Sequence, residues 1–177
     1  MNVTVFGGAQ AQPGSPAYLE AYELGKLLAK AGHSVLTGGY MGTMEAVSRG
    51  ASEAGGHVIG VTCDEIEAWR NSRANPWVKE ERRFPTLEAR LSELVHACDA
   101  AIALPGGPGT LAEIALTWNL MIVDAMPGKP LILVGPGWQA VIEEFTARFQ
   151  VYIGAQALRM LGHAADVVQA VEMLQAG

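Results

Sequence analysis

The 177-residue chain lacks most features that mark membrane, secreted or nucleic-acid-binding proteins. No apolar run approaches the ~20 residues that a membrane span requires, so no membrane partner is expected. The opening residues, "MNVTVFGGAQ", lack the basic start of a signal peptide and read as a strand, which predicts a cytoplasmic protein. Basic residues are scarce: the longest Lys/Arg run is Arg82–Arg83 and the net charge is −6, which argues against a nucleic-acid partner.

Side chains that form disulfides or bind metals are also few. Cys63 ends an apolar run and Cys98 lies on an apolar helix face, so both are expected to be small buried residues. Four histidines are dispersed along the chain and indicate no metal site: His33, His57, His96 and His163. No cofactor is predicted.

What the chain does contain is a regular alternation of short apolar runs and amphipathic stretches. Half of its residues are hydrophobic. Strands are expected at 2–6, 34–39, 57–62, 99–104 and 129–135, and helices at 16–32, 44–56, 86–98, after 109, at 138–149 and at 164–175. Residues 63–84 look irregular. This order predicts an α/β, three-layer Rossmann-like fold: a mostly parallel sheet with helices on both faces, forming a single nucleotide-binding domain over residues 1–177.

Three glycine-bearing turns follow expected strands: "FGGAQ" (6–10), "TGGYMGT" (37–43) and "LPGGPGT" (104–110). Because ligands of such folds bind beyond the carboxyl ends of the strands, we expect all three turns at one edge of the sheet. Glycines let backbone N–H groups approach a ligand closely. The third turn also precedes a helix, whose N-terminus suits a phosphate. A tight strand-to-helix turn without a ligand is the alternative.

These turns supply the candidate phosphate- and nucleotide-binding residues. In the third turn Thr110 either caps the helix or donates its hydroxyl to a bound oxygen. Met44, beside the second turn, is a candidate for contact with a base, although packing is the simpler role. The full set of candidates is Gly8, Gly39, Met44, Gly106, Gly107, Gly109 and Thr110.

Two charged residues lie near the third turn. Glu113 is one helical turn beyond Thr110, where it either favours the helix dipole or faces a ribose. Arg90 stands at the margin of an apolar stripe formed by Leu87, Leu91, Leu94, Val95 and Cys98. It is therefore either solvent-exposed or sends its guanidinium over the edge of the sheet.

Taken together, these residues resemble a known family. "PGGPGTLAE" fits the PGGxGTxxE signature of LONELY GUY (LOG)-type proteins, which are cytokinin riboside 5′-monophosphate phosphoribohydrolases and have often been labelled "putative lysine decarboxylase". The resemblance covers about residues 3–135. It implies a homodimer that binds a nucleoside monophosphate with its phosphate in the PGGxGT turn. By the same resemblance Glu113 and Arg90 are catalytic.

The expected function is therefore hydrolysis of the N-glycosidic bond of AMP or an N6-substituted AMP to free base and ribose 5-phosphate. Decarboxylation is not expected, because none of the four lysines lies in a glycine turn to form a Schiff base with pyridoxal phosphate (Lys26, Lys30, Lys79 and Lys129). Departures from the LOG pattern leave an alternative open. Leu91 follows Arg90 where lysine is usual, and Glu45 replaces a glycine. The stretch "GTMEAVSRGASEAGG" is similar to molybdenum-cofactor carrier proteins, so a non-catalytic nucleotide or molybdopterin-type carrier or sensor is the alternative.

Two further regions carry expectations. Trp69, Trp77 and Arg73, in the irregular stretch, form either a lid over the pocket or a surface loop. Trp118 lies in "IALTWNLMIV", which is unusually apolar for a surface helix, and packs in the core or at a dimer face. An isologous dimer that buries this helix follows as a hypothesis.

Overall fold

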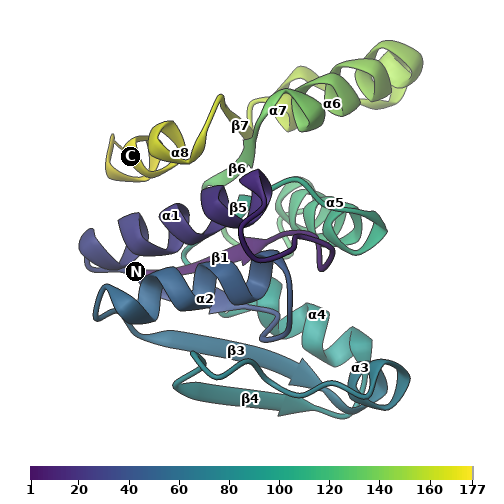
Figure 1. Cartoon of the computed structure of the whole chain (residues 1–177). Coiled ribbons are helices and arrows are strands. Elements are labelled where there is room, and N and C mark those ends of the chain that lie inside the picture. Colours follow the sequence, from purple (N-terminus) through teal and green to yellow (C-terminus); the bar gives the residue numbers. More distant parts are fainter. Residues whose placement is uncertain (177) are drawn as a thin grey trace.

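The computed structural model describes residues 1–176 and shows one parallel sheet between two layers of helices (Figure 1). The strands are β1 (Asn2–Phe6), β2 (Ser34–Thr37), β3 (Val58–Cys63), β4 (Glu80–Phe84), β5 (Ala100–Ala103), β6 (Leu131–Val134) and β7 (Leu161–Ala164). The helices are α1 (Pro16–Lys30), α2 (Thr43–Glu53), α3 (Asp64–Arg70), α4 (Leu87–His96), α5 (Pro108–Ile122), α6 (Pro136–Phe149), α7 (Ala155–Leu158) and α8 (Val167–Ala176), with a 3₁₀ turn at Gln150–Tyr152.

The strand order is β4-β3-β2-β1-β5-β6-β7, and every neighbouring pair is parallel. Alternate residues of β1 divide the core: Val3 and Val5 pack with α1, α2 and α8, whereas Phe6 packs with α4, α5 and α6. The predicted three-layer α/β fold is confirmed. None of the helices in residues 1–176 is long and apolar enough to cross a membrane.

The expectation that residues 63–84 are irregular is wrong, because the segment contains α3 and β4. The sequence of β4, "EERRF", is highly charged and lacks an apolar alternation. It nevertheless pairs with β3 from Ile59↔Glu80 to Cys63↔Phe84 and forms the edge of the sheet, where charged side chains can reach water. The short β7, "LGHA", was also not predicted, since four residues with a glycine give little periodicity.

Other boundaries shift by a few residues, and two packing expectations need comment. Leu94, Val95 and Cys98 are buried as the α4 stripe predicted, but Leu87, the first residue of the helix, is 46% exposed. Trp118 packs in the core, and its Nε1 donates to the carbonyl of Ala157 at 2.8 Å. Cys63 and Cys98 are buried free thiols, as predicted.

Candidate functional site

The three glycine turns meet at one edge of the sheet, as the sequence predicted. The first turn follows β1, which lies between β2 and β5 where the strand order reverses, and it contacts both other turns. The amide of Gly8 donates to the carbonyl of Pro105 at 3.2 Å, and the carbonyl of Gly8 accepts from the amide of Thr43 at 3.0 Å. This reversal point is where doubly wound sheets bind their ligands.

A cleft of about 390 Å³ opens over these turns. Its walls come from the first turn, from the start of α5, from α3, from Tyr40 of the second turn, from one residue of α2 and from two residues of α4. Its lining is of two kinds. We call the N-terminus of α5 with Arg90 and Glu113 the polar half, and Tyr40, Met44, Ile66, Trp69 and Leu87 the apolar half. Arg90 borders both, with an Nη 3.9 Å from Sδ of Met44, and Arg70 adds a second guanidinium to the lining.

The polar half is built around the bare N-terminus of α5. Gly107 is the N-cap residue and provides no side-chain cap for the helix amides. A Cβ added to Gly107 or Gly109 would meet no protein atom within 4 Å, and neither residue has a positive φ. Packing and backbone conformation therefore do not require glycine at these two positions. Their missing side chains instead leave the helix amides open toward the cleft, as an anion site requires.

Gly8 and Gly106 have a different role, which is close packing between turns. A Cβ on Gly8 would lie 3.3 Å from Cα of Gly106, and a Cβ on Gly106 would collide with the hydroxyl of Thr110. Thr110 is 3% exposed and lines the base of the cleft. These contacts hold the first turn against the start of α5.

Glu113 projects from the first turns of α5 into the cleft. Its carboxylate makes neither a hydrogen bond nor an ion pair to any residue of the described chain, 1–176. Desolvation by the surrounding walls raises its pKa to about 7, and the positive charge of Arg90 opposes this rise. A carboxyl group that is half ionised near neutral pH and unpartnered in a cleft is the usual state of a general acid or base.

Arg90 is buried, with 5% of its surface exposed. Of the two orientations expected from the sequence, solvent or the edge of the sheet, the guanidinium adopts the second. Its Nε donates to the carbonyl of Val61 at 2.7 Å and an Nη to the carbonyl of Gly38 at 3.1 Å. The guanidinium also lies 5.6 Å from the centre of the Tyr40 ring. Burial lowers the pKa of Arg90, whereas Glu113 raises it. Arg90 thus joins the ends of β2 and β3 and places a positive charge at the floor of the cleft.

Most of the candidates from the sequence line this cleft: Gly8, Met44, Arg90, Gly107, Gly109, Thr110 and Glu113. Gly39 and Gly106 do not line it. Gly39 has φ +77° and packs against Gly60 and Thr62, so its role is to turn the chain after β2. Gly106 supports the floor through its contacts with Thr110 and Gly8.

Glu45, the residue that departs from the LOG glycine, does not line the cleft. It accepts a hydrogen bond from the Tyr18 hydroxyl at 3.0 Å, between α2 and α1. Its presence therefore does not obstruct the site. Of the three lid candidates only Trp69 lines the cleft; Trp77 lies beneath the guanidinium of Arg49 at 5.5 Å, and Arg73 is exposed elsewhere.

Sequence reasoning found only part of the apolar half of the cleft, Met44 and the lid candidate Trp69. Tyr40, Ile66 and Leu87 were not among its candidates, and neither was Arg70 on α3. The available signal was Trp69, and its neighbours Ile66 and Arg70 become informative only once the helix α3 is recognised after β3.

The fold and cleft define a class: Rossmann-like α/β proteins with a ligand cleft at the strand-order reversal and an uncapped helix N-terminus facing it. Within this class the chain belongs to the SLOG cluster4 family, whose model matches residues 1–156. The resemblance to LOG-type proteins is thereby confirmed.

The similar proteins include a phosphoribohydrolase and molybdenum cofactor proteins. The cytokinin riboside 5′-monophosphate phosphoribohydrolase LOG of Oryza sativa subsp. japonica is 38% identical over 110 residues, which are 60% of this chain and 45% of that protein. The chain thus spans about half the length of this relative. Solved structures include the molybdenum cofactor binding protein of Rippkaea orientalis, with TM-score 0.77, 28% identity and coverage of 99% and 95% of the two chains. The molybdenum cofactor carrier protein of Chlamydomonas reinhardtii has TM-score 0.73, 28% identity and coverage of 99% and 96%.

Proposed function

We propose that the cleft binds a nucleoside 5′-monophosphate and that the protein hydrolyses its N-glycosidic bond, releasing free base and ribose 5-phosphate. AMP or an N6-substituted AMP is the proposed substrate. The observation that carries this proposal is the juxtaposition of an open helix N-terminus with an unpartnered, desolvated carboxyl group, Glu113, one helical turn further along. The likeness to LOG of rice supports the same chemistry.

In the proposed reaction each part of the polar half has one task. The amides at the start of α5, left open by Gly107 and Gly109, hold the 5′-phosphate and so fix the ribose. The carboxylate of Glu113 stabilises the cation that develops at the anomeric carbon and takes a proton from the attacking water. The water oxygen bonds to that carbon, the C–N bond breaks, and its electron pair leaves with the base, which takes up the proton that Glu113 accepted from the water.

Arg90 acts as a positioning residue in this scheme. Two of its donors are occupied by the carbonyls of Val61 and Gly38, so it holds the ends of two strands. Its charge also favours the ionised form of Glu113, which is the form that accepts the proton. Replacement of Arg90 by lysine would keep the positive charge but would not reproduce the hydrogen bonds to both carbonyls.

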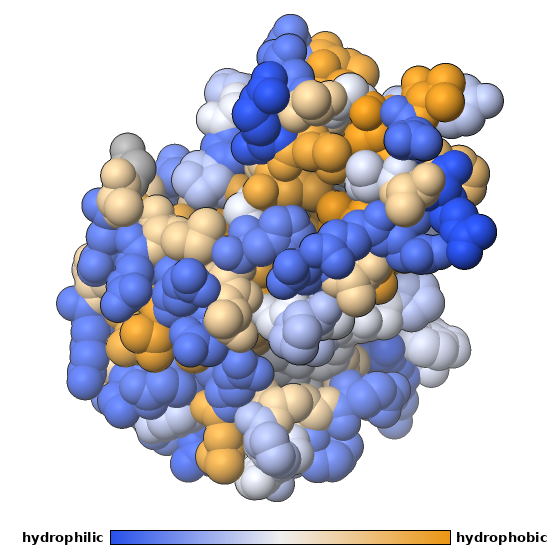
Figure 2. All heavy atoms as spheres, turned by 90° about the horizontal axis from the view of Figure 1, so that it is seen from above, coloured by the Kyte–Doolittle hydropathy of each residue, from blue (hydrophilic) through white to orange (hydrophobic). Residues whose placement is uncertain are grey.

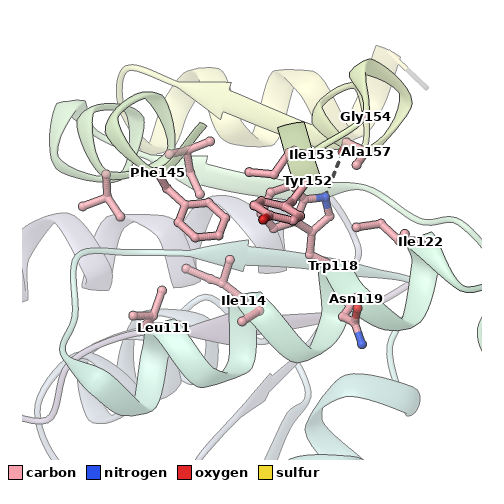
Figure 3. Close-up of a pocket in the computed structure, with 13 residues that line it drawn as sticks. Leu111, Ile114, Trp118, Asn119, Ile122, Phe145, Tyr152, Ile153, Gly154 and Ala157 are labelled. Carbon is pink, nitrogen blue, oxygen red and sulfur yellow. Dashed lines mark hydrogen bonds between the residues drawn. The ribbon is translucent and has the colours of Figure 1, made fainter. Parts of the chain in front are cut away.

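A homodimer is the proposed assembly, and its support is a hydrophobic surface on α5 and α6. A groove of about 500 Å³ lies between these helices, with Leu111, Ile114 and Ile122 of α5 facing Phe145 and Tyr152 (Figure 3). The space-filling view shows hydrophobic side chains gathered between polar borders on the side of the molecule seen from above (Figure 2). Eight exposed large hydrophobic side chains lie on these helices or directly after them: Leu111, Ile122, Val123, Val141, Phe145, Phe149, Val151 and Tyr152. Five of them line the groove, and exposed hydrophobic side chains gathered in this way are typical of a protein interface.

The test of the proposed reaction is incubation of the purified protein with AMP and with an N6-prenylated AMP, followed by chromatography of free base and ribose 5-phosphate. Release of base is expected, with a rate that increases with pH up to about 7 as Glu113 ionises. Glu113→Gln keeps the shape of the side chain but cannot accept the proton, so turnover should be lost while nucleotide binding remains. An unimpaired Glu113→Gln rate would contradict the assignment.

A second candidate function, a carrier or sensor of a phosphorylated nucleotide or molybdopterin-type ligand, is favoured by the matches to molybdenum cofactor proteins, which span nearly all of both chains. The same incubation distinguishes it. A carrier binds its ligand with saturation and returns it chemically unchanged, so binding without release of base would favour this candidate over hydrolysis.

A further inference from the structure

Trp69 is the tryptophan of this chain with the most exposed surface, 75%, and it lines the cleft. The indole is large and apolar, and full exposure of such a ring forgoes the burial that normally stabilises it. Of the other three tryptophans, Trp118 and Trp138 are buried and Trp77 is partly buried. An exposed indole beside a ligand cleft therefore indicates a contact that forms only when the cleft is filled.

The helix that carries Trp69 is firmly attached to the sheet. Arg83 of β4 forms ion pairs with Asp64 at 2.6 Å and Glu67 at 2.8 Å, both on α3. Glu65 accepts a hydrogen bond from the amide of Leu87 at 2.7 Å and so connects α3 to the start of α4. The position of Trp69 is thus set by contacts to two other elements and does not depend on a loose loop.

The ring itself is held by its neighbour. The guanidinium of Arg70 lies 4.8 Å from the centre of the Trp69 ring, which is a cation–π distance. Ile66, one helical turn earlier, and Leu87, which is 46% exposed, add apolar surface to the same side of the cleft. The guanidinium of Arg70 thus restrains the indole, and the apolar side chains of Ile66 and Leu87 line the cleft with it.

The two halves of the cleft therefore suit a ligand that carries two different chemical groups. The start of α5 suits a phosphate, and the wall of Ile66, Trp69 and Leu87 suits a flat aromatic ring. A sugar phosphate alone would satisfy the first half and leave the second exposed to water. Purine 5′-monophosphates carry both groups, separated by a ribose.

We propose that Trp69 stacks on the purine base of the bound nucleotide and is the residue that makes the cleft select purine 5′-monophosphates over sugar phosphates. Arg70 is the positioning residue for the indole. This inference rests on the proposed nucleotide-binding function of the cleft but does not depend on hydrolysis, because stacking precedes any cleavage.

The experiment uses Glu113→Gln protein, so that nucleotide is not consumed, and measures binding of AMP and of ribose 5-phosphate by calorimetry together with tryptophan fluorescence. AMP is expected to quench the emission, whereas ribose 5-phosphate binds without quenching. Adding Trp69→Ala should weaken AMP binding by roughly tenfold to a hundredfold, the usual loss of one base–aromatic stack, and leave ribose 5-phosphate binding unchanged. Trp69→Phe should abolish the quenching and retain most of the AMP affinity.

The matched control is Trp77→Phe, which removes a partly buried indole outside the cleft and should leave the quenching intact. Because Trp69 is exposed, Trp69→Ala should unfold at the same temperature as its parent. An unchanged AMP affinity in Trp69→Ala, or quenching that persists in Trp69→Phe, would overturn the inference even if wild-type protein hydrolyses AMP. Conversely, stacking by these measures without release of base in the wild-type protein would defeat the proposed hydrolysis alone.

Discussion

Gly109 provides a direct test of the phosphate site at the scale of one residue, because α6 contains a matched position. Both helices begin with Pro-Gly, at Pro108–Gly109 in α5 and Pro136–Gly137 in α6, and a Cβ on either glycine meets nothing within 4 Å. Alanine at either site should leave the fold intact and stabilise it slightly, by up to about 1 kcal/mol.

Only one of the two variants should affect ligand binding. A methyl group on Gly109 would stand over the amides proposed to hold the phosphate, so Gly109→Ala should weaken AMP binding by at least about tenfold, or about 1.4 kcal/mol. Gly137→Ala should bind as the parent does. Calorimetric titration with AMP measures the affinity of both variants. Equal affinities would show that the phosphate does not bind at the start of α5.

Glu113 makes the stability of the protein depend on pH in a direction opposite to that of a salt-bridged carboxylate. Desolvation raises its pKa from 4.5 to about 7, so the folded state binds a proton that the unfolded state has released. The stability contributed by this proton is complete below about pH 4.5 and is lost as the pH rises through about 7.

Glu113→Gln, which is neutral at every pH, should therefore resemble the wild type near pH 4.5 and exceed its melting temperature at pH 8. The difference should be of the order of ten degrees, since a rise of the pKa from 4.5 to about 7 corresponds to about 3 kcal/mol, and 1 kcal/mol shifts the melting temperature by roughly 2–4 °C in a protein of this size. Calorimetric melting at both pH values measures it. Glu172→Gln, on the exposed side of α8, is the control, and a Glu113→Gln difference that does not change with pH would contradict the raised pKa.

At the scale of elements, Asn75 connects the segment after α3 to the second glycine turn. Its Nδ2 donates to the carbonyls of Gly39 at 3.0 Å and Tyr40 at 2.9 Å, and its Oδ1 accepts from the amide of Trp77 at 3.2 Å. The side chain is 7% exposed, so these groups have no ready replacement from water. One amide thus holds the approach to β4 against the turn that begins α2.

Asn75→Ala should lower the free energy of unfolding by roughly 1–3 kcal/mol, because it removes the donor to the carbonyl of Tyr40 and the acceptor for the amide of Trp77. The carbonyl of Gly39 keeps a donor, the backbone amide of residue 75 at 2.7 Å. Asn75→Asp keeps the size and the acceptor but loses both donated bonds, and it should be destabilised as well. Urea unfolding measures both variants, and AMP affinity should fall with them as the turn loosens. A wild-type urea midpoint in Asn75→Ala would show that the segment does not depend on this side chain.

At the scale of the whole molecule, the proposed dimer predicts that a single substitution in the interface changes the mass of the protein in solution from that of a dimer to that of a monomer. Phe145 is 43% exposed on α6 at the groove and packs against Phe149, with ring centres 5.3 Å apart and ring planes tilted by 52°. Phe145→Glu would place a charge in the interface, so light scattering should give a dimer mass for the wild type and a monomer mass for the variant. Leu19→Glu, at an exposed position of α1, should remain dimeric. A monomeric wild type would contradict the assembly.

The features that the sequence determined by itself are local ones. Alternating apolar runs and amphipathic stretches set the α/β layers, and glycines at strand ends marked the three turns, since both signals act over a few neighbouring residues. The "PGGPGTLAE" stretch likewise carries its own helix start and places Glu113 one turn beyond it. Most of the candidate cleft residues were therefore accessible without a structure.

What only the tertiary structure decided depends on residues far apart in the chain. From the sequence, Arg90 could have faced either water or the sheet. It faces the sheet because the carbonyls of Gly38 and Val61 accept hydrogen bonds from its guanidinium. The charged strand β4 forms because β3 offers it a free edge, and Trp69 becomes part of the site only because α3 is attached to β4 and α4. The pKa of Glu113 is likewise a property of the assembled walls. Burial, desolvation and pairing partners are set by packing across the molecule, and no local pattern encodes them.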